Sequence, residues 1–175
     1  MFTIRWLSYA LKKRGENVKW QKRKRAKTVN NLVICDNSYN ILAISDCIDG
    51  NHHDNFEIVE NIKTILKTLD RQHIQYQTTH LNADSGFDVK AFVDFIEENQ
   101  IIANIKKNKR NQKKKMPEYR YFSDYIYRFR FKIEVVFAWL DTYKRLLVRF
   151  EVIARHFKSW YLIASSMINF RHIFN

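Results

Sequence analysis

The chain has 175 residues, 46% of them hydrophobic, which excludes a disordered protein and suffices to bury the core of about one domain. It carries 31 Lys and Arg against 18 Asp and Glu, and the net charge of +13 favours a polyanionic partner such as DNA, RNA or an anionic membrane. Its two cysteines are too few for a disulfide framework or a four-cysteine zinc site.

The sequence predicts no membrane anchor, and its first residues do not have the pattern of a signal peptide. No apolar run in the chain approaches the ~20 residues of a spanning helix, and the first residues lack a basic leader, so we expect a cytoplasmic address. Residues 12–27 are dominated by cations and predict an exposed basic arm or edge. The apolar runs 28–36 and 39–47 predict a β-hairpin, and the periodicity over roughly 55–69 predicts a helix.

The second half alternates strand and helix patterns. Residues 78–83 and 100–106 predict short strands, and residues 88–99 between them predict an amphipathic helix. From Tyr121 the pattern is helical, ending in a last helix over roughly 157–170. This order predicts an α/β fold with a mixed sheet flanked by helices. The residues expected on the buried side of the long helical segment are Ile126, Phe129, Ile133, Val136, Phe137, Leu140 and Leu147.

The stretch LNADSGFD places Asp84 directly after a predicted strand. One interpretation is a turn, because Asp and Gly are common turn residues. The other is a functional site, because open α/β sheets bind ligands at the carboxyl ends of their strands.

Tyr127, Arg130 and Glu134 have a spacing that places them on one face of the long helix, within about 60° of one another. Taken alone, this spacing is typical of a structural ion pair between Arg130 and Glu134.

Several motifs together resemble a known family. LNADSGFD, IIANIKKNKRN and YRFRFKIEVVFAWLDTYKRLLVRFE, in this order, are similar to the catalytic core of bacterial insertion-sequence DDE transposases of the insertion-sequence four and five grouping. LVICDNSYNILAISDCIDGNHHD resembles the hairpin and loop of the same family. The resemblance implies an RNase H-like fold, and Tyr127, Arg130 and Glu134 match the family signature Tyr-x2-Arg-x3-Glu.

The resemblance also implies a chemistry. DDE transposases cut and join DNA by phosphoryl transfer, which two Mg²⁺ or Mn²⁺ ions assist, and such hard ions prefer carboxylate oxygens. By this resemblance Asp84 and Glu134 are the expected catalytic residues and metal ligands. Tyr127 and Arg130 would hold a DNA phosphate beside them.

The match fails at one catalytic position. The family has a first Asp on its first strand, whereas the corresponding place here, Arg5 to Ser8, holds no acid. We therefore expect an N-terminally truncated core with a degenerate or missing first strand, and impaired activity. We divide the chain into a basic arm with the remnant of the first strand (1–27) and a partial catalytic domain (28–175). Asp36, Asp46 and Asp54 are other acids that could substitute, but turns and helix caps explain them better.

Two basic clusters fit a DNA partner, because clustered cations bind phosphates without reading sequence. The alternative for each is a solvated loop. The expected DNA-binding cations are Lys22, Arg23, Lys24 and Arg25 in the first cluster and Lys106, Lys107, Lys109, Arg110, Lys113, Lys114 and Lys115 in the second.

Two functions stay open from the sequence. The first is a transposase, acting on transposon ends and target DNA near the nucleoid, with impaired catalysis. The second is a non-catalytic protein that binds double-stranded DNA or pairs with an intact transposase. A homodimer is compatible with both.

Overall fold

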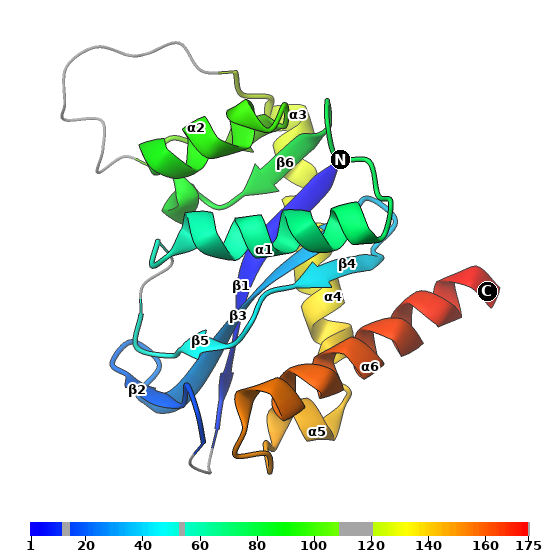
Figure 1. Cartoon of the computed structure of the whole chain (residues 1–175). Coiled ribbons are helices and arrows are strands. Elements are labelled where there is room, and N and C mark those ends of the chain that lie inside the picture. The colour runs from blue at the N-terminus through cyan, green and yellow to red at the C-terminus, as the bar shows by residue number, and fades with distance from the viewer. Residues whose placement is uncertain (12–14, 53–54, 109–120, 175) are drawn as a thin grey trace.

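The computed structural model describes residues 1–11, 15–52, 55–108 and 121–174, and its centre is one mixed sheet (Figure 1). The strands are β1 (Phe2–Ala10), β2 (Lys19–Gln21), β3 (Ala26–Asp36), β4 (Ile41–Ile44), β5 (Ile48–Asp49), β6 (His80–Ala83) and β7 (Ile102–Ile105). Their order in the sheet is β2-β3-β1-β6-β7, with β4 and β5 also paired with β3.

β1 lies in the middle of this sheet. It pairs antiparallel with β3 along its whole length, from Phe2 opposite Asp36 to Ala10 opposite Thr28, and parallel with β6 on its other side. β6 in turn pairs parallel with β7. The antiparallel pairing of β3 with β4 confirms the predicted hairpin. The parallel strands end at the same edge of the sheet, which is where Asp84 follows β6.

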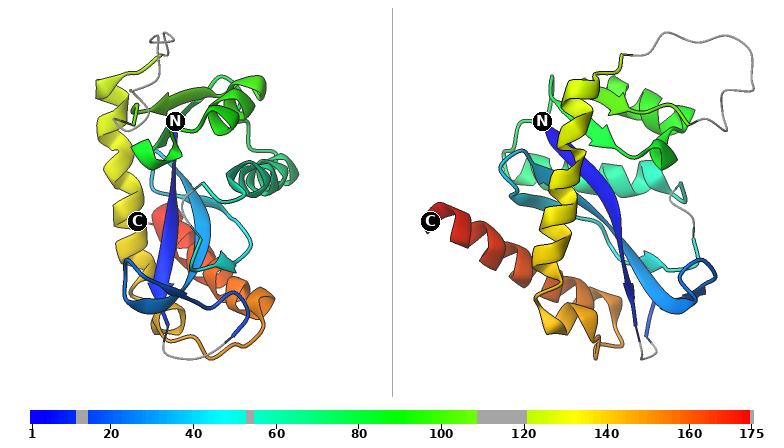
Figure 2. Two further views of the ribbon diagram at one scale, coloured as in Figure 1. Left: turned by 90° about the vertical axis from the view of Figure 1, so that its left-hand side faces the viewer. Right: turned by 180° about the vertical axis from the view of Figure 1, so that it is seen from behind.

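Helices cover both faces of the sheet. Figure 2 shows α1 on one side and the run from α3 to α4 on the other, where α3, a 3₁₀ turn and α4 follow one another as one rod. The predicted order of helices is confirmed. The helices are α1 (Ile58–Arg71), α2 (Lys90–Glu98), α3 (Asp124–Tyr127), α4 (Lys132–Leu140), α5 (Lys144–Leu147) and α6 (Ala154–Phe174), with 3₁₀ turns η1 (Ser85–Phe87) and η3 (Arg128–Phe131).

Two apolar clusters form the core, one on each face of the sheet, because successive side chains of a strand point to opposite faces. Ile4 of β1 belongs to the cluster under α1 and α2. Leu7 and Tyr9 belong to the cluster under α4, α5 and α6. The odd-numbered residues near the middle of β1 therefore face α4, and Arg5 is one of them.

Two expectations are corrected. The first strand is not missing: its nine residues form the central strand, since their alternating apolar side chains fit both cores. Only the expected acid is absent from it. Leu147 is 40% exposed, and Leu146 is buried in its place, because the chain leaves α4 after Leu140 and α5 starts with a new helical phase.

No helix in the described part of the chain combines the length and apolarity that crossing a bilayer requires.

Candidate functional site

Asp84 stands at the carboxyl end of β6, where the chain turns into η1. Its backbone carbonyl accepts a hydrogen bond from Phe87 N (2.9 Å), so the residue does form a turn. Its side chain, however, does not cap the turn: it accepts a hydrogen bond from Arg130 and forms an ion pair with Arg5. The second acid of the same motif, Asp88, accepts from Asn108 N (2.6 Å) and ties the segment after β7 to this edge of the sheet.

The α3 to α4 rod brings the predicted helical residues to Asp84. Arg130 donates a hydrogen bond to Asp84 and lies 3.7 Å from the carboxylate of Glu134. The guanidinium carbon of Arg130 is 5.3 Å from the centre of the Tyr127 ring. The structure thus gathers Asp84, Tyr127, Arg130 and Glu134 in one place.

Arg5 completes this group from β1. Its Nη1 donates to Oε1 of Glu134, and its Nε lies 3.4 Å from Oδ2 of Asp84. The role of Arg5 was not predicted from the sequence, because the resemblance implies an acid on this strand and not a cation. The feature of the sequence that could have indicated it is a cation inside an otherwise largely apolar strand.

We call Arg5, Asp84, Arg130 and Glu134 the ion cluster. Each arginine contacts both carboxylates, and the formal charges cancel. The side chains are about one-third exposed, except that of Glu134, which is 52% exposed. Beside the cluster, burial raises the pKa of Tyr127, against the opposing effect of Arg130, so its hydroxyl stays protonated at neutral pH. The hydroxyl remains available as a hydrogen-bond donor.

Two buried asparagines anchor the rod to the sheet. Asn82 and Asn104 face each other across β6 and β7, both fully buried, and Asn104 Nδ2 donates to Asn82 Oδ1 (2.7 Å). Asn104 also accepts from Ser123 N (2.8 Å), and Asn82 donates to Ile126 O (3.0 Å). These bonds fix the start of α3, and through it the position of Arg130 and Glu134. Sequence reasoning missed both asparagines, although Asn104 is the one polar residue of β7 and Asn82 stands between two buried apolar residues of β6.

The basic clusters lie at different places. Lys22, Arg23, Lys24 and Arg25 form the exposed turn between β2 and β3, where Lys24 donates to Ser8 O (2.7 Å). Lys106 and Lys107 are exposed directly after β7, at the same sheet edge as Asp84. The other predicted cations of this cluster lie outside the described residues; they are Lys109, Arg110, Lys113, Lys114 and Lys115.

The two other candidate acids in the described part of the chain, Asp36 and Asp46, have partners away from the ion cluster. Asp36 accepts from Ser38 N and Asn40 N, both at 2.8 Å, which confirms its interpretation as a turn residue. Asp46 pairs with Lys158 at 2.7 Å. Asp54 lies outside the described residues.

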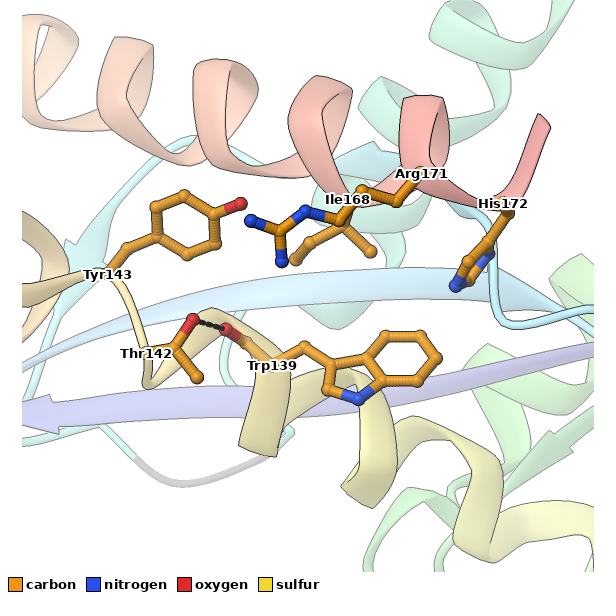
Figure 3. Close-up of a pocket in the computed structure, with 6 residues that line it drawn as sticks. All are labelled: Trp139, Thr142, Tyr143, Ile168, Arg171 and His172. Carbon is orange, nitrogen blue, oxygen red and sulfur yellow. Dashed lines mark hydrogen bonds between the residues drawn. The ribbon is translucent and has the colours of Figure 1, made fainter. Parts of the chain in front are cut away.

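A small pocket of about 220 Å³ lies between the end of α4 and α6 (Figure 3). In Figure 3 the guanidinium of Arg171 points toward the ring of Tyr143, and Thr142 bonds to the carbonyl of Trp139 at 2.7 Å. None of the predicted site residues lines this pocket. It is separate from the ion cluster.

The residues present do not fit a divalent metal centre as they stand. Within the described ranges, no group of three or more His, Cys, Asp or Glu side chains could hold a metal ion. Both carboxylates of the ion cluster already accept hydrogen bonds from guanidinium groups. The cluster instead joins β1, β6 and the rod through pairs of opposite charge.

Comparison with known proteins gives one match. The family model described as "Transposase DDE domain" matches residues 5–169 of the chain. Neither the curated proteins nor the solved structures yielded a match.

Proposed function

The chain belongs to the transposase DDE domain family, and from this premise we propose that it binds double-stranded DNA through a transposase-type catalytic domain whose cleavage activity is impaired. The sheet order and flanking helices are those expected of an RNase H-like fold. The observation that carries the impairment is the ion cluster: Arg5, and not an acid, stands beside Asp84 and Glu134. Transposon ends and target DNA, in the nucleoid, are the expected substrates.

The two acids and the two helical residues beside them have distinct proposed roles. Asp84 and Glu134 are the remaining members of a catalytic triad of acids, and Tyr127 and Arg130 contact a DNA phosphate. When bound, Mg²⁺ or Mn²⁺ would activate the nucleophile and stabilise the leaving oxygen in such a site. Two carboxylates engaged with arginines are a poor donor set for these ions, so we assign no reaction step to them here.

A second function, metal-dependent DNA cleavage and strand transfer, is favoured by one observation. Asp84 and Glu134 come from separate elements and still converge on the same guanidinium groups. This convergence is what a phosphoryl-transfer site would need. The insertion-sequence four and five grouping remains a prediction of the resemblance, and a homodimer is compatible with both functions.

A nicking assay on supercoiled DNA distinguishes the two functions. We expect the wild-type chain to bind the DNA in Mg²⁺ or Mn²⁺ without nicking it. Nicking that disappears in Glu134→Ala would refute impaired cleavage and support an active transposase. Nicking that persists in Glu134→Ala would indicate a contaminating nuclease.

The salt dependence of binding tests the DNA partner. Each phosphate contact contributes a slope of about −0.9 to log K against log salt concentration. Replacing Lys106, Lys107 and Lys109 by Gln should therefore flatten the slope by up to about 2.7 units. The charge-matched control replaces three other exposed cations by Gln, namely Lys67 and Arg71 of α1 and Lys90 of α2, which belong to helices on the face of the sheet away from the α3 to α4 rod. Equal slopes for both variants would contradict DNA binding at this edge.

A further inference from the structure

The side chain of Arg5 fills the space between two carboxylates that come from different elements. Its guanidinium group contacts Glu134 with Nη1 and approaches Asp84 with Nε at 3.4 Å. Arg130, which comes from η3, contacts the same two acids. Each carboxylate therefore contacts both guanidinium groups, and these two positively charged groups occupy the position between the carboxylates.

The sheet register brings Arg5 to this position. Thr3 pairs with Asn82 in the parallel ladder of β1 and β6, so two residues further along the strands Arg5 comes level with Asp84. Since side chains alternate between faces, Arg5 points to the same face as Thr3, Leu7 and Tyr9, which is the face that α4 covers. Arg5 is thus a residue of the central strand that contacts both acids, and an acid at its position would complete a group of three carboxylates.

We propose that Arg5 is a built-in cation that takes the place of a divalent metal ion between Asp84 and Glu134. The ion cluster then assembles without metal, and a divalent ion can enter only by displacing a guanidinium group. This inference rests on the proposed function, because it explains how a transposase-type site is closed to metal while the domain keeps its fold.

The proposal predicts that one substitution opens the site. In Arg5→Asp the two arginines and two carboxylates become one arginine and three carboxylates, and hard divalent ions favour such an oxygen-rich group. A ligand that binds only the folded state raises its melting temperature. At roughly 10 mM Mn²⁺ we expect Arg5→Asp to gain about 3 °C or more, and the wild type to gain no specific shift.

Three variants make the experiment decisive. Arg128→Asp is the charge-matched control, since Arg128 is an exposed arginine of η3 and its substitution changes the net charge equally. Arg5→Gln removes the cation without adding a like charge, so it reports even if Arg5→Asp does not fold. Arg5→Asp/Asp84→Asn removes one of the three carboxylates again and should lose the gain.

The Mn²⁺-induced shifts in melting temperature of the variants decide the proposal. A Mn²⁺ shift in folded Arg5→Asp that exceeds those of the wild type and Arg128→Asp supports the proposal. If Arg5→Asp is unfolded, a larger shift in Arg5→Gln than in the wild type does so. The proposal is overturned by equal shifts in the folded Arg5 variant and the wild type, or by a wild-type shift that Asp84→Asn abolishes.

DNA binding by the wild type in EDTA separates this proposal from the proposed function. Failure to bind DNA under any condition would refute the DNA partner, while the Mn²⁺ titration would still decide the role of Arg5. Binding with a failed titration would refute the role of Arg5 alone.

Discussion

Replacing Asn104 by Ala should destabilise the protein far more than the loss of a few side-chain atoms suggests, because those atoms make several hydrogen bonds. The substitution removes three hydrogen bonds: those from Asn104 Nδ2 to Asn82 Oδ1 (2.7 Å) and to Ser123 O (3.2 Å), and that from Ser123 N to Asn104 Oδ1 (2.8 Å). A buried polar group left without a partner costs about 1–3 kcal/mol. Asn82 is fully buried, whereas Ser123 is half-buried and can regain water. We therefore expect a loss of about 3 kcal/mol in the free energy of unfolding.

Urea denaturation measures this loss by linear extrapolation, with an unchanged m-value as the sign of an unchanged folded state. The matched control is Asn99→Ala at the end of α2, where a half-buried amide donates one hydrogen bond to Phe95 O (2.8 Å). That variant should lose less than about 1 kcal/mol. Equal losses in both variants would refute the role of the asparagine pair as the anchor of the rod.

Two other predictions concern the rest of the fold. Gly50→Ala should lower the free energy of unfolding, measured in urea, by about 2 kcal/mol or more, because a Cβ at Gly50 would lie 2.0 Å from Thr28 O. Gly15→Ala is the control and should cost less, because its Cβ would meet the nearest atoms at 3.1 Å. A larger loss in Gly15→Ala than in Gly50→Ala would contradict this packing. Burial lowers the pKa of His80, so the unfolded chain takes up a proton first as the pH falls below about 6.5, and the folded state loses stability down to the lowered pKa. His80→Gln should therefore reduce the loss of stability between about pH 7 and 5, and thermal melts with an unchanged pH dependence would rule this out.

The sequence predicted the elements well because most of them carry strong periodicity. The long helix illustrates this, since Ile133, Val136 and Leu140 are buried as the pattern required. The same pattern failed at Leu147, where a break in the helix shifts the phase by one residue. A break after Asp141 has no Gly or Pro to signal it.

The candidate site was predicted in part. Helical spacing alone placed Arg130 beside Glu134, and the resemblance brought Asp84 to them. The contribution of Arg5 depends on the register between β1 and β6, which are far apart in the chain. The alternation of side chains fixes which face of the sheet each residue points to, but not which residue of β6 lies opposite a given residue of β1. The same holds for Asn82 and Asn104, whose partnership exists only after β6 and β7 pair.

The central position of β1 also has a consequence for how the protein folds. β1 precedes both of its partners in the chain and can pair early with β3, but its other edge stays open until β6, which begins at His80, has been made. Pairing between distant segments is slow, and open strand edges favour aggregation in the meantime. A charged residue inside an apolar strand opposes such aggregation. Arg5 is a charged residue of this kind, and it precedes both of its partners, Asp84 and Glu134, in the chain.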